Sequence, residues 1–217
     1  MNSIEMTKRT KLKRAVDRGS YDRDVVNAII DEAYICHVGF AVDGQPYVVP
    51  TIHARVGDQL YLHGSAASRM LRTIRDEGVP VCVTISIVDA LVMARSGMHH
   101  SMNYRSVMVL GQAVQVTDDA EKMTALEAVV EQVMKGRWDD TRGPNRSEMK
   151  QTMVLRLPIT EASAKMRAGM PKDDEEDMDL PHWAGLVPLR IVPGTPIPDP
   201  LQPADRQIPG YMKDLNR

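Results

Sequence analysis

The sequence predicts a mainly β protein in which antiparallel strands form a barrel or a sandwich, with helices at its periphery. Two observations carry this prediction. Several runs with strand character follow one another directly, separated by short turn signals. The chain also lacks the G-x-G-x-x-G and G-x-x-x-x-G-K motifs that accompany parallel nucleotide-binding sheets. Its 217 residues, of which 43% are hydrophobic, suffice for one domain with a packed core.

Charge and hydropathy exclude several classes of protein. A net charge of −2 and a pI near 6.3 give no general attraction to nucleic acid or to an anionic membrane. The basic stretch from Lys8 to Arg14 is short and has no interleaved aromatic residues, so we expect a solvated arm and no nucleic-acid partner. No apolar run approaches the ~20 residues of a membrane-spanning helix, and the N-terminus lacks the apolar core of a signal peptide. We therefore expect a cytoplasmic protein without a membrane partner.

The two cysteines, Cys36 and Cys82, each lie inside an apolar run with strand character. We expect both to be buried free thiols, as in a cytosolic protein. Their spacing does not suit metal ligands, so the sequence predicts no metal site.

The first folded element is a helix. We expect residues 1–19 to form a flexible arm that precedes the domain. Over residues 21–32, Val25 and Ile29 recur at helical spacing, which predicts a helix. Asp22 is suited to cap its N-terminus.

Three strands joined by tight turns are expected next, over residues 34–42, 45–55 and 59–63. Asp43 and Gly44 predict a hairpin turn, because glycine tolerates the positive φ that such turns need. A second helix is expected over 65–77, with Ser65 as N-cap and Gly78 at its C-terminal end.

The second half of the chain carries weaker signals. We expect a strand over 79–94 that is broken near Val88 and Asp89, then a strand over 103–116. Asp118 opens a helix to about residue 135, for which we expect five inward side chains: Met123, Leu126, Val130, Val133 and Met134. Further strands are expected over 151–159 and 183–192, and an acidic loop over 172–179. The domain then spans 20–192, followed by a proline-rich extended tail over 193–217.

The segment from His63 to Arg69 joins a strand to the start of a helix. Free amides and the helix dipole favour an anion there. Ser65 and Ser68 offer hydroxyl donors, and Arg69 in the first turn is unfavourable for the dipole unless an anion is bound. A phosphate site is therefore one interpretation. An ordinary serine-capped helix with a solvated arginine is the other.

Two further segments concentrate polar or aromatic groups. His99 and His100 are adjacent on an extended stretch and point to opposite faces, so they are a weak metal signal. Arg105 and Ser106 offer donors to an anionic or carbonyl-bearing ligand, unless they only mark the start of a surface strand. Trp183 is suited to stack on a ring or to anchor a C-terminal strand.

Taken together, five segments in this order resemble the pyridoxamine 5′-phosphate oxidase-like flavoproteins, and within them the subgroup of Nim-type nitroimidazole reductases and flavin-nucleotide-binding proteins. The matching segments cover most of residues 20–192: Tyr21-Asp22, Asp43 to Pro50, Leu60 to Ser65, Asn103 to Gly111 and Trp183 to Leu189. The resemblance implies a split β-barrel of Greek-key-like antiparallel strands with flanking helices. It also implies flavin mononucleotide (FMN) as cofactor, bound at the interface of a homodimer.

The resemblance implies roles for individual residues. Backbone groups of four residues would face the isoalloxazine edge: Val49, Pro50, Thr51 and Ile52. Four residues would hold the ribityl phosphate: His63, Ser65, Ser68 and Arg69. Five residues would flank the flavin: Asn103, Tyr104, Arg105, Ser106 and Trp183. Tyr104 and His100 are the candidate polar contacts for a small substrate.

The C-terminal region departs from the family, because an Arg-x-His motif that helps hold pyridoxal substrates is missing after Leu189. Oxidation of pyridoxamine phosphate is therefore not expected. The resemblance instead implies two-electron oxidoreductase chemistry on a small molecule, with a reduced nicotinamide as electron donor. Two alternatives on the same fold are a non-catalytic flavin- or haem-binding module, with His63 or His100 as haem ligand, and a deazaflavin-coenzyme reductase.

Overall fold

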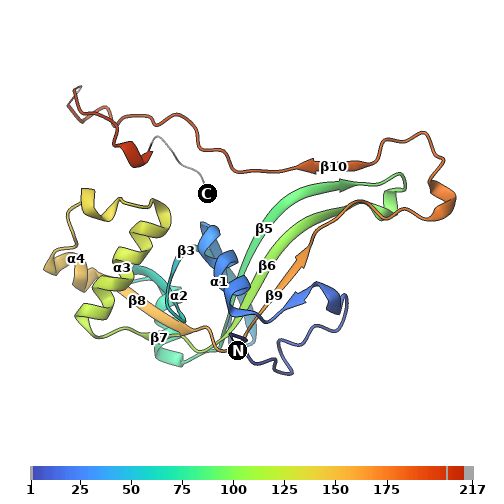
Figure 1. The fold of residues 1–217 in the computed structure, drawn as a ribbon. Coiled ribbons are helices and arrows are strands. Elements are labelled where there is room, and N and C mark those ends of the chain that lie inside the picture. Colours follow the sequence, from blue (N-terminus) through green and yellow to red (C-terminus); the bar gives the residue numbers. More distant parts are fainter. Residues whose placement is uncertain (1, 204, 213–217) are drawn as a thin grey trace.

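A curled antiparallel sheet of ten strands forms the body of the molecule (Figure 1). The computed structural model describes residues 2–203 and 205–212. The strands follow the order β1-β9-β6-β5-β2-β3-β4-β8-β7, and β10 pairs with β5. Their bounds are β1 Gly19–Ser20, β2 Ile35–Val42, β3 Gln45–Val56, β4 Gln59–Ser65, β5 Val81–Met93, β6 Ser101–Gly111, β7 Val114–Gln115, β8 Thr152–Pro158, β9 Ala162–Arg167 and β10 Gly185–Pro188.

The helices lie around this sheet, which confirms the predicted fold class of an antiparallel β protein with flanking helices. They are α1 Arg23–Glu32, α2 Arg69–Glu77, α3 Asp119–Val133 and α4 Arg146–Gln151. Short 3₁₀ turns are η1 Val16–Arg18, η2 Gly97–His99, η3 Trp138–Asp140, η4 Glu175–Asp177 and η5 Gly210–Met212. Within the described ranges, no helix has both the length and the apolarity to cross a membrane.

The predicted turns and caps at the start of the domain are confirmed. Asp43 and Gly44 have φ of 50° and 79°, the backbone conformation of a tight hairpin between β2 and β3. The Asp22 carboxylate caps α1 by accepting from the amides of Asp24 and Val25. The predicted break in the long strand is a β-bulge in β5, between Val88 and Ala90.

The main core lies between the sheet and α1. Leu60 and Leu62 of β4 pair with Leu157 and Leu155 of β8, and all four side chains are fully buried. Between them, Tyr61 faces the opposite side and joins a second, smaller core beneath α3. Strand β4 is therefore covered on both faces, which explains its continuous apolar sequence.

The second helix begins three residues later than predicted. Ser65 is the last residue of β4, where it pairs with Thr152 of β8. Its hydroxyl accepts from the Ala67 amide at 3.1 Å, in a turn that precedes the helix. The N-cap of α2 is Ser68, and Gly78 ends the helix with φ of 59° as predicted. The prediction placed the cap at Ser65 because pairing with a distant strand leaves no local sequence signal.

The predicted inward face of α3 was wrong in part. The buried residues are Ala125 and Val129, whereas Val133 is 45% exposed. The Lys122 amine donates to the Met149 and Thr152 carbonyls at 2.6 Å each, and this bond pair fixes the rotation of the helix. Small residues therefore face the sheet, and the larger apolar residues lie beside them.

Residues 2–19 contact the domain and differ in this from the loose arm that we expected; Met1 lies outside the described residues. Ile4 and Thr10 are buried, and the Arg9 guanidinium pairs with Glu161. Their contacts lie close to β9, a strand that the sequence analysis did not predict and that pairs with both β1 and β6. The missed strand explains the error, because without β9 the arm has no visible partner.

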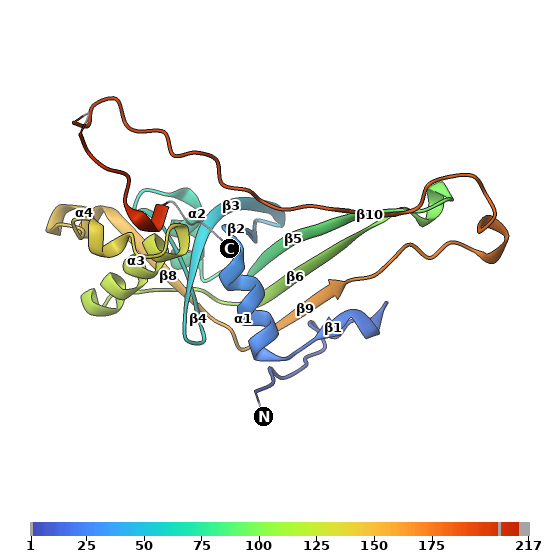
Figure 2. The ribbon, with the colours of Figure 1, turned by 45° about the horizontal axis from the view of Figure 1, so that its top comes forward.

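Strands β5 and β6 extend beyond the barrel as a long two-stranded arm, with β10 beside them (Figure 2). After β10, which confirms part of the strand expected over 183–192, the proline-rich chain returns toward α3 and α4. There the Tyr211 hydroxyl donates to Asp140 at 2.6 Å and accepts from Arg137 at 2.9 Å. Between these two attachments, Ile191, Val192, Ile197 and Leu201 are at least 80% exposed.

Both cysteines are free, as predicted. Cys36 is buried, and burial raises the pKa of its thiol to about 12. Cys82 is only half-buried, so the prediction of burial fails for this residue. Its strand β5 lies between β2 and β6, and the side chain points to the less covered face of the sheet.

Candidate functional site

Strands β3 and β4 separate, and this separation defines the candidate site. They pair from Val56↔Gln59 to His53↔Leu62, and no further. Residues Gln45–Ile52 pair with β2 on one side only, and His63–Ser65 pair with β8 on one side only. Two strand edges with unpaired backbone groups therefore face the opening, which we call the β3–β4 split. This includes the predicted backbone segment Val49, Pro50, Thr51 and Ile52.

Helix α2 begins beside the same opening. Arg69, its first residue, stacks on the Tyr47 ring of β3 with the guanidinium carbon 5.2 Å from the ring centroid. Its Nη2 donates to the Tyr47 hydroxyl at 3.4 Å. Tyr47 in turn stacks on Phe40 of β2, with centroids 5.6 Å apart. This aromatic pair holds the guanidinium at the split instead of leaving it in bulk solvent.

The start of α2 offers several donors for an anion. Throughout the part of the chain that the structure describes, the amides of Arg69 and Met70 donate to no protein acceptor, and no salt bridge engages Arg69. The first turn also contains no acidic residue. Two free amides, a guanidinium and the exposed Ser65 hydroxyl thus lie at one helix end, where the dipole favours a negative charge.

One of the predicted phosphate-binding residues, Ser68, has a structural role, and so does the neighbouring Gly64. The Ser68 hydroxyl accepts from the Leu71 amide at 3.5 Å, so it caps the helix. A Cβ at Gly64 would lie 3.1 Å from Leu71 Cδ1, so this glycine lets the helix pack closely on β4. The candidate anion seat therefore consists of Arg69, the first free amides and Ser65.

His63 lies on β4, on the same strand face as Ser65. The side chain is half-buried, and burial lowers the pKa of its imidazole, which favours the neutral ring. The Nδ1 atom is buried and has no partner among the described residues. A neutral ring with an unpaired nitrogen is a potential ligand or proton acceptor.

The predicted polar segment of β6 is already engaged within the chain. Asn103 is buried, donates to the Gly169 carbonyl at 3.2 Å, and accepts from Arg167. Ser106 donates its hydroxyl to the Lys165 carbonyl at 3.1 Å. Both side chains therefore hold β9 and the turn after it against β6.

Arg105 pairs with two carboxylates. Its Nη2 lies 2.7 Å from Glu32 and 2.7 Å from Asp89, and its Nε donates to Asp89 at 3.0 Å. The hydrogen bonds that the guanidinium donates to Glu32 and Asp89 raise its pKa further. Asp89 is the residue that the β-bulge inserts, so the bulge aims this carboxylate at Arg105.

One chain does not bring all the predicted residues together. Strands β5 and β2 separate β6, with Tyr104, from the β3–β4 split. Trp183 is 67% exposed and packs its ring over Gly185, where a Cβ would come within 2.9 Å of the ring. His100 is exposed near the tip of the arm, with Nδ1 3.0 Å from the Ser96 carbonyl oxygen.

Sequence reasoning missed Tyr47 and Phe40, the residues that position Arg69. A usable signal was present, because aromatic residues make up only 4% of the chain and Phe40 is its one phenylalanine. The two rings flank the predicted Asp43-Gly44 turn, so a hairpin would place them face to face. Their registered pairing, Phe40↔Tyr47, bears this out.

An antiparallel sheet that opens between two strands, with helices around it, is the architecture of a split barrel. The sequence profile of the family described as pyridoxamine 5′-phosphate oxidase matches residues 22–166. The chain belongs to this family, and the predicted resemblance and split-barrel fold are confirmed. No curated protein matches the chain.

Three solved structures are similar to this chain over different shares of its length. The flavocytochrome Anf3 from Azotobacter vinelandii has 39% sequence identity and a TM-score of 0.88, over 95% of this chain and 96% of that chain. An FAD and haem binding protein from Mycobacterium smegmatis has 33% identity and a TM-score of 0.86, over 90% of this chain and 96% of that chain. A putative 5-nitroimidazole antibiotic resistance protein from Bacteroides thetaiotaomicron has 26% identity and a TM-score of 0.57, over 68% of this chain and 85% of that chain.

Proposed function

We propose that the protein is a flavin-binding redox protein whose flavin lies in the β3–β4 split, with a phosphate group at the start of α2. The observation that carries this proposal is the unpaired Arg69 guanidinium, held by Tyr47 beside two free amides and an open strand edge. A flavin nucleotide needs an anion seat and a row of backbone groups for the polar edge of its ring. The residues present fit both needs.

One of the two similar structures that span nearly the whole chain favours FAD over the FMN that the sequence resemblance implies. One is described as a flavocytochrome and the other as an FAD and haem binding protein. FMN and FAD share the ring and the first phosphate, so the seat at Arg69 serves either one. We propose FAD and treat FMN as the alternative that a binding titration distinguishes.

When bound, a flavin supplies two-electron transfer, and the protein binds, orients and shields it. The free backbone groups of β3, from Val49 to Ile52, would fix the ring edge. Arg69 and the α2 amides would neutralise the phosphate. The exposed apolar side chains of Val48 and Ile52 would cover the ring or a flat substrate. We propose a small-molecule substrate and a reduced nicotinamide as electron donor.

We further propose that the flavin site is completed by a second copy of the chain. Tyr104 of β6 and Trp183 lie away from the split within one chain, although the family resemblance implies that they flank the flavin. The arm also exposes large apolar side chains that a partner would cover, among them Met102 at 50%, Val88 at 42% and Val187 at 42%. A homodimer would place the arm of one subunit beside the split of the other.

The test begins with the absorbance spectrum of the purified protein and a titration with FAD and with FMN. We expect a stoichiometric yellow complex, tighter binding of FAD, and bleaching of the flavin band under anaerobic NADH or NADPH. Light scattering should give the mass of a dimer. Absence of flavin binding would reject the proposal, whereas flavin bound without reduction by either nicotinamide would favour a non-catalytic module.

A second candidate function is haem binding, because the two similar structures are described as a flavocytochrome and an FAD and haem binding protein. Two imidazoles of this chain suit an axial ligand. His63 has a buried, unpartnered Nδ1, and His100 can donate from Nδ1 to the Ser96 carbonyl while Nε2 stays open. Haem would add one-electron chemistry.

The haem test uses the Soret band of protein reconstituted with haem. Loss of the band in His63→Ala or in His100→Ala would identify the ligand. An unchanged band in both variants would assign the haem to another residue, and no band at all would reject this second function.

A further inference from the structure

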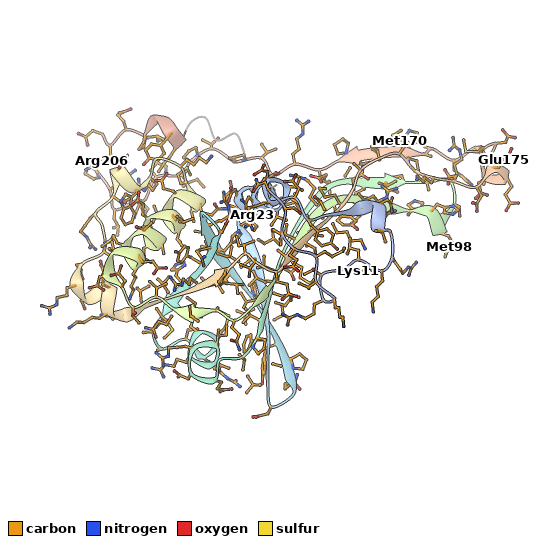
Figure 3. The ribbon with its side chains drawn as sticks, turned by 60° about the horizontal axis from the view of Figure 1, so that its bottom comes forward. Lys11, Arg23, Met98, Met170, Glu175 and Arg206 are labelled. Atoms are coloured by element: carbon orange, nitrogen blue, oxygen red, sulfur yellow. The ribbon has the colours of Figure 1, made fainter. Side chains whose placement is uncertain are left out.

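The tip of the long arm carries a group of donor atoms that the flavin proposal does not use. Two short turns meet there: η2 (Gly97–His99), which connects β5 to β6, and η4 (Glu175–Asp177), which lies between β9 and β10. Figure 3 places the labelled residues Met98 and Glu175 together at this far end of the molecule. The acidic run over 172–179 therefore lies beside the turn that carries His99.

Three side chains from these two turns converge. One ligand atom each of His99, Asp173 and Asp177 lies within 4.8 Å of the others, and all three residues are partly buried. The His99 Nε2 also lies 3.7 Å from a carboxylate oxygen of Asp174. An imidazole with two carboxylates is a donor set that transition-metal dications accept.

Asp173 is held in a fixed orientation. Its carboxylate is 1% exposed, and Oδ1 accepts from the amides of Arg95 and Ser96 at 2.8 and 3.2 Å. Arg95 also donates to Oδ2 at 3.1 Å. Hydrogen bonds of this kind orient the ligands of metal sites. Each carboxylate oxygen has two acceptor positions, so Oδ2 keeps one for an ion.

One ring nitrogen of His99 lacks a hydrogen-bond partner in the described part of the chain. Its Nδ1 atom is buried and has no hydrogen-bond partner among the residues that the structure describes. A buried polar atom without a partner carries a desolvation cost. An ion at this position would remove that cost, and no neighbouring donor does so.

The local charge also favours a cation. Five acidic residues lie in sequence from Asp173 to Asp177, and within the described ranges Arg95 is the arginine that pairs with one of them, Asp173. Mutual repulsion among these carboxylates destabilises the loop unless a positive charge is added. A dication bound by both turns would offset the repulsion and join the loop to the arm.

We propose that His99, Asp173 and Asp177 form a binding site for a divalent transition metal ion, of which Zn²⁺ fits the donor set best. This proposal replaces the sequence-based expectation of no metal site. That expectation rested on cysteine and neighbouring-histidine spacing, which does not detect ligands brought together from two distant turns. Small side-chain rotations would give the bond lengths of about 2.0–2.2 Å that zinc requires. Water would complete the coordination.

The test is a calorimetric titration of the full-length, tag-free, metal-stripped protein with Zn²⁺. We expect one ion per chain and a rise in melting temperature. His99→Ala and Asp177→Asn should each weaken zinc binding about tenfold or more, a loss at least as large as that from removing an outer-shell group. The matched controls are His100→Ala and Asp179→Asn, which change a neighbouring histidine and a neighbouring acidic residue outside the group and should bind like the wild type.

Three results would overturn the proposal: no zinc binding, binding equal in all four variants, or a stronger response to Ca²⁺ than to Zn²⁺. Calcium is the comparison because an acidic loop alone would prefer it to zinc. Far-UV circular dichroism checks the fold of each variant without using the flavin. Should His99→Ala not fold, His99→Asn and Asp177→Asn carry the same comparison.

Discussion

The start of α2 and the polar segment of β6 look alike in sequence, and the structure separates them. Both contain an arginine, a serine and a short polar run, and both were predicted to bind the cofactor. At α2, Arg69 has an aromatic support and no carboxylate partner in the described chain. On β6, Arg105 is held by Glu32 and Asp89, and Asn103 by the turn beyond β9. Donors without internal partners mark a ligand site, whereas paired donors shape the scaffold.

The largest effect that tests this contrast is expected for Arg69→Ala. The substitution removes a charge-assisted hydrogen bond of about 1.5–3 kcal/mol, so flavin affinity should fall roughly 10- to 100-fold. Flavin fluorescence titration measures the change. The control is Arg75→Ala, in the last turn of the same helix, where the arginine pairs with Asp76. Equal losses in both variants would remove the basis for placing the phosphate at α2.

Unlike Arg69→Ala, Asn103→Ala should reduce stability and leave flavin affinity unchanged. The buried amide bonds to Gly169 and Arg167 on both of its ends. Leaving these partners unsatisfied should lower the free energy of unfolding by about 1–3 kcal/mol, with flavin affinity of the folded protein unchanged. Urea unfolding and flavin titration of the same sample measure the two quantities. A loss of affinity without a loss of stability would return Asn103 to the flavin site.

A smaller effect is expected for Arg105→Met. The Arg105 side chain is 30% exposed and its two carboxylate partners are 40% and 34% exposed, so water screens the pairs. We expect a loss of about 1 kcal/mol or less in the free energy of unfolding, which shrinks further in high salt. Urea midpoints at low and high salt check this. A stability loss that salt does not reduce would contradict the assignment of Arg105 to a surface network.

The smallest effect concerns pH. Burial lowers the pKa of His63 from its ordinary 6.5 in the folded protein, so the unfolded chain binds the proton more readily. The contribution of His63 to stability is therefore present above pH 6.5 and is lost as pH falls toward its lowered value. His63→Gln should flatten this part of the urea-midpoint profile between pH 7.5 and 5.5. An unchanged slope would show that the imidazole is not desolvated.

Local signals predicted most of the fold. The Asp43-Gly44 turn, the Asp22 cap and the bulge near Val88 are each specified by neighbouring residues, and each was located from sequence. The errors share one cause, which is dependence on distant partners. Strand β9 and the packed N-terminal arm stabilise each other across the length of the domain, and β8 extends β4 as far as Ser65. No local pattern records such pairings.

In the candidate site, too, some features follow from local sequence and others depend on how separate elements pack. Arg69 and the β3 segment were found because a strand–turn–helix with serines and an arginine is a local motif. The support of Arg69 by Tyr47, and the pairing of Arg105 with Glu32, depend on the packing of separate elements. Sequence therefore indicates which residues offer donors. Only the folded chain shows which of these donors are already used.

The pairing of Gly19 with Lys165, at opposite ends of the domain, has a consequence for biosynthesis. A ribosome adds about 5–20 residues per second, so roughly ten to thirty seconds separate the two segments. Throughout that interval Arg9 lacks its partner Glu161. The nascent segment around Arg9 is then an accessible target for chaperones and proteases until β9 emerges.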